Sequence, residues 1–212
     1  MSETGMSAQD FREMMIFVAG RMTEEEPHLN SLDAAVGDGD HGITMQLGFA
    51  AVARKLGELE VQTGIDNLLS EAGMTFMAAT GGASGVVFGK MFMAGGRSLK
   101  GIRQFGPLEF KSLLNAMESS VSSSGKVKPG DKTVLDAIAS AANSLADSDA
   151  PLLEAFRKAA TAAEAAAQET ANMICRVGRA SRLGERALGH PDPGAVSFSI
   201  ILRAMADWLA AR

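Results

Sequence analysis

Apolar residues recur at helical spacing through most of this 212-residue chain, and no segment shows the strict alternation of a half-buried strand. The clearest helical segment is the alanine-rich stretch 151–174, which carries its charges on one side. Seven more segments carry the pattern: 7–22, 44–56, 64–79, 86–99, 107–122, 133–145 and 196–211. We therefore predict an all-α protein of about eight helices in a single domain spanning 1–212. Residues 1–6 are expected to be disordered, and the polar stretch 122–131 to be a mobile loop.

The composition agrees with packed helices and excludes several kinds of function. Tyrosine is absent and aromatic residues make up only 5% of the chain, which suits close helix packing better than a sheet. A formal charge of −5 argues against a nucleic-acid partner. We find no run long enough to span a membrane and no signal-peptide pattern, so a cytoplasmic protein without a membrane partner is expected. The single cysteine, Cys175, has no partner for an intrachain disulfide.

Four glycine-rich strings interrupt the helical pattern, and each stands just ahead of a predicted helix: 37–42, 81–85, 130–133 and 189–195. A helix N-terminus offers unpaired N–H groups and a partial positive charge, and glycine allows a phosphate to approach them closely. The repetition favours phosphate binding. The alternative is that these glycines only turn the chain between antiparallel helices, and each string taken alone fits that interpretation as well.

The first string contains a dense group of hard ligands. Asp33, Asp38 and Asp40 offer carboxylate oxygens within eight residues, the ligand type that Mg²⁺ prefers while it takes further oxygens from phosphates. The glycines of this string formally match a dinucleotide fingerprint, but no strand precedes them and two aspartates would face a pyrophosphate. The spacing of oxygens also excludes an EF-hand. We predict a site for magnesium and phosphate; the alternative is that these aspartates only cap helices and turns.

A basic group near the C-terminus has the spacing of one helical face. Arg179, Arg182 and Arg186 fall at positions i, i+3 and i+7, and the guanidinium group matches the geometry of phosphate oxygens. Glycine-rich sequence on both sides favours a segment that faces phosphate. The alternative is a solvated face paired with Glu185 and its neighbours.

Taken together, these strings resemble the nucleotide-binding L subunit of dihydroxyacetone kinases. The resemblance rests on four motifs in the family's order and spacing: residues 32–42, 81–85, 129–133 and 178–195. It covers the chain from about Ser7 to its end. The resemblance implies a barrel of eight antiparallel helices with a nucleotide at one end. It also implies two Mg²⁺ ions between the nucleotide phosphates and three aspartates, here Asp33, Asp38 and Asp40.

The resemblance further implies a set of nucleotide contacts. These are His41, Gly42, Ile43, Thr44, Ala83, Ser84, Gly125, Val134, Arg179, Pro191, Asp192 and Pro193. The histidine is expected to contact the nucleotide as a neutral group rather than to act as a base. The chain departs from the family where Asn, Met, Tyr and Gln are common, at Thr44, Val134, Arg182 and Pro191. Because the aspartates are unchanged, we expect nucleotide and metal binding to be retained.

The activity that the resemblance implies is phosphoryl transfer by one half of a kinase. A separate K subunit would hold a short ketose, and a phosphocarrier M subunit of the sugar phosphotransferase system is a further possible partner. The nucleotide is either ADP held as a fixed cofactor or ATP that exchanges, and the sequence does not choose between them. Two alternatives stay open: a nucleotide-sensing module without its own turnover, and the nucleotide domain of a system similar to fatty acid kinase.

Overall fold

The computed structural model describes residues 5–212, except for the side chains of residues 179, 180, 182 and 183. The described residues form nine α-helices: α1 (Ala8–Glu24), α2 (Glu26–Val36), α3 (His41–Glu58), α4 (Ile65–Thr80), α5 (Gly82–Ser98), α6 (Pro107–Gly125), α7 (Val134–Ser144), α8 (Leu152–Glu169) and α9 (Pro193–Ala210). Two 3₁₀ helices, η1 (Thr170–Asn172) and η2 (Arg179–Ala187), lie between α8 and α9. The prediction of an all-α fold is confirmed.

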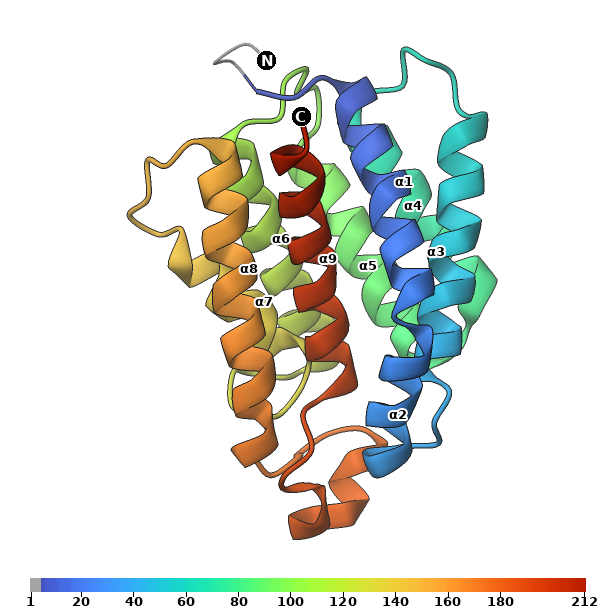
Figure 1. Ribbon diagram of the computed structural model, residues 1–212, viewed down its shortest axis with the longest axis vertical. Coiled ribbons are helices and arrows are strands. Elements are labelled where there is room, and N and C mark those ends of the chain that lie inside the picture. The colour runs from blue at the N-terminus through green and yellow to red at the C-terminus, as the bar shows by residue number, and fades with distance from the viewer. Residues whose placement is uncertain (1–4) are drawn as a thin grey trace.

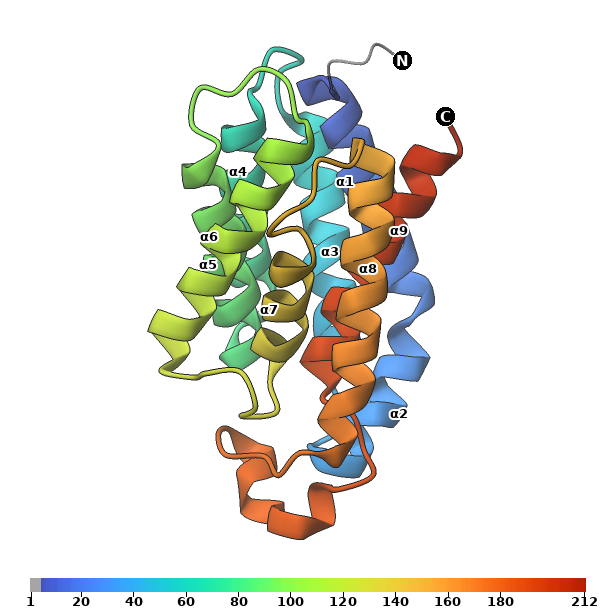
Figure 2. The ribbon, with the colours of Figure 1, turned by 90° about the vertical axis from the view of Figure 1, so that its left-hand side faces the viewer.

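Eight of the helices form a closed ring. In chain order without α2, each helix contacts the next, and α9 contacts α1. Successive ring helices run in opposite directions along the long axis of the molecule, which is the barrel that the resemblance implies (Figures 1 and 2). The described chain begins and ends at the same end of the ring, called here the terminal end. The opposite end carries residues 36–41, 80–82, 126–133 and 170–192 and is called the cavity end.

Helix α2 is the ninth helix, and the sequence pattern did not reveal it. The chain was expected to leave helical structure at residues 24–27, but α2 begins at Glu26, and Pro27 occupies its first turn. Only Leu29 and Val36 are buried among its eleven residues. It therefore lacks the apolar stripe from which an amphipathic helix is recognised. It continues from α1 toward the cavity end and packs on α3.

The polar stretch expected as a loop is partly helical. Helix α6 runs on to Gly125 and ends at Lys126, whose backbone is left-handed with a φ of 52°. The loop thus spans 126–133 rather than 122–131. Its mobility stays a prediction.

The long segment 151–174 also ends earlier than its pattern indicates. Helix α8 stops at Glu169, and the carbonyl of Thr170 accepts a hydrogen bond from the side chain of Lys132. Beyond it, η2 is broken at Gly184, where φ is 55° and ψ is −127°. The three arginines would share one face only if this segment were an α-helix, and the break at Gly184 shows that it is not. The side chains of Arg179 and Arg182 lie outside the described part of the chain.

Phenylalanine rings fill much of the ring's interior. Phe11, Phe105 and Phe110 pack edge to face near the terminal end, with ring centroids 5.0 and 6.2 Å apart. Met6 joins this group: it is 2% exposed, and its backbone exchanges two hydrogen bonds with Phe105. The predicted disorder therefore does not extend to Met6, while residues 1–4 lie outside the described residues. Among the helices that the structure describes, none is long and apolar enough to cross a membrane.

Candidate functional site

A cavity of about 360 Å³ opens at the cavity end of the ring. Its walls come from the end of α2, the N-terminal ends of α3, α5, α7 and α9, and the segment after η1. All four glycine-rich strings contribute to it, through residues 37, 38, 40 and 41, residues 81–84, residues 132–133 and residues 192–194. Strings separated by up to 150 residues thus meet at one place because alternate ring helices begin at the same end.

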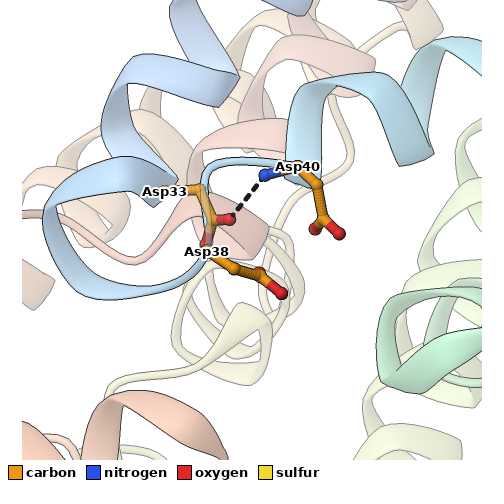
Figure 3. Close-up of side chains that lie close together, drawn as sticks. All are labelled: Asp33, Asp38 and Asp40. Atoms are coloured by element: carbon orange, nitrogen blue, oxygen red, sulfur yellow. Dashed lines mark hydrogen bonds between the residues drawn. The ribbon is translucent and has the colours of Figure 1, made fainter.

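The three predicted metal ligands lie together at this cavity. One carboxylate oxygen from each of Asp33, Asp38 and Asp40 lies within 4.8 Å of the others. Asp33 Oδ2 accepts hydrogen bonds from the backbone N–H groups of Gly39, at 2.9 Å, and Asp40, at 3.1 Å. Figure 3 shows the carboxylates of Asp38 and Asp40 pointing to the same side. Asp33 therefore both shapes the turn and adds an oxygen to the cluster.

These donors fit a divalent cation that prefers oxygen. Asp40 occupies the N-cap position of α3, yet its side chain makes no capping hydrogen bond. The interpretation that the aspartates merely cap helices thus fails for Asp40, although Asp33 does stabilise a turn. Both Asp38 and Asp40 are exposed, so ligands from a bound molecule can complete the coordination. Several carboxylates with open positions suit Mg²⁺, which keeps waters or phosphate oxygens in its coordination shell.

His41, at the first position of α3, is buried between two serines. Ser197 donates its hydroxyl proton to the Pro193 carbonyl, at 2.9 Å, so it accepts from His41 Nε2 at 2.8 Å. The Nδ1 atom is then the acceptor, and it faces the Ser84 hydroxyl at 3.4 Å. Burial lowers the pKa of His41. The geometry thus agrees with a neutral histidine, and it links α3, α5 and α9 around the cavity.

The turn into α5 depends on backbone freedom. Gly81 and Gly82 have φ values of 66° and 65°, and a Cβ atom at either would contact nothing within 4 Å. Glycine is therefore required at both positions by the left-handed backbone conformation, not by a lack of room for a side chain. The turn places Ala83 and Ser84 at the cavity, in the first turn of the helix, where N–H groups lack intrahelical partners.

Helices α7 and α9 begin on the other side of the cavity. Thr133 caps α7 through Leu135 N, and Val134 is 7% exposed beside it. Asp192 caps α9, its Oδ2 accepting from Ala195 N at 2.8 Å. Loss of solvent around Asp192 raises the pKa of its carboxyl to about 7, against the lowering effect of the Ala195 hydrogen bond.

The charges at the helix starts differ between the two ends of the ring. At the terminal end, the first turns of α1, α4, α6 and α8 each carry one acidic residue: Asp10, Asp66, Glu109 and Glu154. At the cavity end, the first turn of α7 carries Asp136, but the first turns of α3, α5 and α9 carry no acidic residue. Acidic side chains compensate the positive end of a helix dipole. Because Asp192 caps α9, the starts of α3 and α5 are the two that have neither a first-turn acid nor a side-chain cap and so offer a positive end to an anion.

Most, but not all, of the predicted nucleotide contacts line the cavity. Those that do are His41, Thr44, Ala83, Ser84, Val134, Asp192 and Pro193. Gly42 instead faces α2, where a Cβ would lie 2.1 Å from the Glu26 carbonyl, and Ile43 is exposed. Gly125 and Pro191 are absent from the lining, and the side chain of Arg179 lies outside the described residues. Nucleotide contact stays a prediction for these five residues and for the seven that line the cavity.

The cavity also contains residues that were not predicted as contacts. Lys132, Phe88, Cys175 and Val177 belong to its lining. Burial raises the pKa of the Cys175 thiol, which donates to the Val177 carbonyl at 3.0 Å, so it acts as a small protonated filler. Lys132 lies within the third glycine-rich string. It was not predicted as a site residue because the sequence does not show that its side chain is buried.

Comparisons with known proteins place this chain in a family. Residues 35–207 match the DAK2 domain, and the chain belongs to this family. It is 35% identical over 210 residues to a Listeria innocua protein named PEP-dependent dihydroxyacetone kinase 2, ADP-binding subunit DhaL, covering 98% of this chain and 97% of that one. The corresponding ADP-binding subunit DhaL of Escherichia coli is 38% identical over 185 residues, or 86% of this chain and 88% of that one.

A solved structure shows the same fold. It is the crystal structure of the dihydroxyacetone kinase from C. freundii in complex with AMP-PNP and Mg²⁺, with a TM-score of 0.73 and 28% identity. The match covers 92% of this chain and 33% of that one, so this chain spans about a third of that kinase. The resemblance drawn from the four motifs is confirmed, and the relatives named here are kinases or kinase subunits.

Proposed function

We propose that this chain is the nucleotide- and Mg²⁺-binding subunit of a kinase for dihydroxyacetone or a related short ketose. The observation that carries the proposal is one cavity that holds three clustered carboxylates together with the starts of α3 and α5, whose first turns carry no acidic residue. The carboxylates attract cations and the helix starts attract anions, a combination that suits a magnesium-bound phosphate chain. The printed names of the relatives, an ADP-binding subunit above all, support the same function.

In this proposal, acidic side chains would bind the metal ions and backbone N–H groups would bind the phosphates. Asp33, Asp38 and Asp40 would hold one or two Mg²⁺ ions, which when bound neutralise charge on phosphate oxygens. The free N–H groups at the starts of α3 and α5 would hold the phosphates in place. His41, neutral and fixed by Ser197, adds no charge to this balance. The protein would thus orient the phosphoryl group and stabilise its charge rather than form a covalent intermediate.

In this proposal, a second protein binds the ketose that accepts the phosphoryl group. Among the described residues, the cluster of Asp33, Asp38 and Asp40 is the one group of three side chains that could hold a metal ion. Transfer from a nucleotide bound there requires the acceptor oxygen to lie roughly 3 Å from the phosphorus. A ketose-binding K subunit would supply it. Either exchange of ATP or rephosphorylation of bound ADP by a phosphocarrier M subunit would renew the donor.

Titration calorimetry with ADP, with and without Mg²⁺, tests the first half of the proposal. We expect binding that depends on Mg²⁺. Addition of a K-type subunit, ketose and ATP or a phosphorylated carrier then tests transfer, which neither protein should perform alone. Nucleotide binding without transfer in any combination would instead indicate a sensing module. Ketose phosphorylation by this chain alone would overturn the half-enzyme proposal.

A further inference from the structure

The chain between α8 and α9 leaves the ring and returns through a narrow neck at the cavity end, shown in orange to red in Figures 1 and 2. Two hydrogen bonds join the segment that leaves α8 to the segment that returns to α9. The N–H of Asp192 donates to Thr170 Oγ1 at 2.7 Å, and the N–H of Gly189 donates to the Ala171 carbonyl at 2.8 Å. We call residues 172–188, which lie beyond this neck, the end loop.

The ammonium group of Lys132 fills the neck. Its Nζ donates to the carbonyls of Thr170 at 2.7 Å, Ala187 at 2.9 Å and His190 at 2.6 Å. A lysine has three N–H donors, so every donor has a partner, two from the returning chain and one from the outgoing chain. Lys132 is 1% exposed. Such burial is tolerated because the group is fully hydrogen-bonded, and loss of the ammonium would leave three carbonyls without this donor.

Lys132 extends from a braced loop. Asp136 accepts from the backbone N–H groups of Gly130, at 2.5 Å, and Thr133, at 2.7 Å. Asp131 accepts from the N–H of Lys128 at 2.9 Å, and its carbonyl accepts from Arg176 N in the end loop. Lys132 itself has a φ of 60°, a conformation that side-chain-bearing residues seldom adopt. Lys132 thus extends from a loop that Asp136 of α7 braces on both sides, and one backbone hydrogen bond from Arg176 joins this loop to the end loop.

The end loop forms part of the cavity wall. Cys175, Val177 and Gly178 line the cavity beside Lys132 and Thr133. We propose that Lys132 is a positioning residue: its ammonium fastens the end loop against the ring, and nucleotide affinity depends on that fastening. This inference rests on the proposed function, because it concerns how the same cavity holds its nucleotide. When the competent arrangement is only partly populated, the apparent Kd rises by the inverse of that fraction.

The test compares Lys132→Met with Lys128→Met. Both changes remove one positive charge from the same loop, but Lys128 is exposed and its side chain does not enter the neck. Hydrogen exchange by mass spectrometry follows residues 172–188 against the ring helices, and calorimetry gives the Kd for ADP with Mg²⁺. For Lys132→Met we expect faster exchange confined to the end loop and a Kd raised about tenfold or more. With a K-type partner, the KM for nucleotide should rise more than kcat falls.

Three results would overturn the inference: an end loop of Lys132→Met that exchanges as in the wild type, faster exchange spread evenly over the ring, or an equal loss of affinity in Lys128→Met.

If Lys132→Met does not fold, the variant Thr170→Val tests the inference instead. It is close in shape and keeps the Thr170 carbonyl that Lys132 bonds, but it removes the acceptor for Asp192 N and the donor to the Ala167 carbonyl at the end of α8. It should therefore open the end loop and raise the Kd roughly threefold. Unchanged exchange and affinity in that variant would overturn the inference. Failure of the wild type to bind ADP with Mg²⁺ would instead overturn the proposed function, while the exchange data would still test the fastening.

Discussion

The two ends of the barrel are built from the same helices yet are used in opposite ways. At the terminal end, Ser7 and Asp10 form a complete capping box on α1, and Glu109 accepts from Gly106 N ahead of α6. At the cavity end, Thr133 and Asp192 cap α7 and α9, whereas the N-cap residues of α3 and α5 form no side-chain cap. The first arrangement satisfies helix ends within the protein. The second leaves them for a ligand.

The buried residues inside the ring also differ between the terminal end and the cavity end. Near the terminal end, phenylalanine rings pack together and Arg12 is the buried charge, bonded to the carbonyls of Leu59 and Glu60. At the cavity end, the buried polar residues His41 and Lys132 reach across the chain to fix cavity walls. The difference shows that one helical scaffold can separate stability from binding by the choice of a few first-turn and loop residues. Substitutions at matched positions can break or sharpen this comparison.

The largest effect is expected for Asp40→Asn. Asp40 makes no cap, so the folded state should lose little stability, while the metal loses a charged ligand. We expect ADP affinity in Mg²⁺ to fall by roughly a hundredfold and the melting temperature without ligand to stay nearly unchanged. The matched control is Asp66→Asn at the terminal end, which should bind ADP normally. Calorimetry that finds equal ADP affinity for Asp40→Asn and the wild type would contradict the metal assignment.

A smaller effect is expected when an acid is introduced at a helix start. Ala83→Asp puts a carboxylate in the first turn of α5, where it should stabilise the helix dipole slightly but repel phosphates. We expect ADP affinity to fall by about tenfold, with the free energy of unfolding raised by up to about 1 kcal/mol. Leu108→Asp places a carboxylate at an exposed position in the first turn of α6, at the terminal end. If both variants bind ADP with equal affinity, the absence of an acidic residue at the start of α5 does not control nucleotide binding.

A change in pH dependence is expected for Asp192→Asn. The folded pKa of about 7 lies above the ordinary value near 3.8, so the folded state holds a proton that the unfolded state releases. Stability is therefore lost as the pH rises from about 4 to 7. Because Asn also caps helices, the variant should escape this loss and exceed the wild type by roughly 1–3 kcal/mol above pH 7. Denaturant unfolding without nucleotide or Mg²⁺ measures it; parallel pH profiles would refute the assignment, and Asp147→Asn serves as the control.

The smallest effect is expected for Ser7→Ala at the terminal end. The Ser7 hydroxyl accepts from Asp10 N at 3.1 Å and donates to Asp10 Oδ2 at 2.6 Å. Loss of this cap should lower the free energy of unfolding by about 1 kcal/mol, or roughly 2–4 °C in melting temperature. ADP affinity should not change. A clear loss of affinity would show that the two ends are coupled rather than separate.

Sequence alone determined the features that depend on local order. The eight ring helices follow from apolar spacing, and the aspartate cluster from ligands placed within a few residues of one another. Both are local because a helix repeats every few residues and a short loop cannot separate its own side chains widely. Four similar strings, each ahead of a helix, were also visible without any structure, since caps and turns leave their mark on the adjoining residues.

Only the tertiary structure decided which distant residues meet. Helix α2 exists through its packing on α3, since its own sequence has no apolar stripe. Ser197 fixes His41 across 156 positions, and Lys132 reaches Ala187 across 55. Gly125 falls outside the cavity lining because α6 continues to it. The physical reason is that periodicity records which face a residue occupies, whereas the partner of a buried hydrogen-bonding group depends on how ring closure brings separate backbones together.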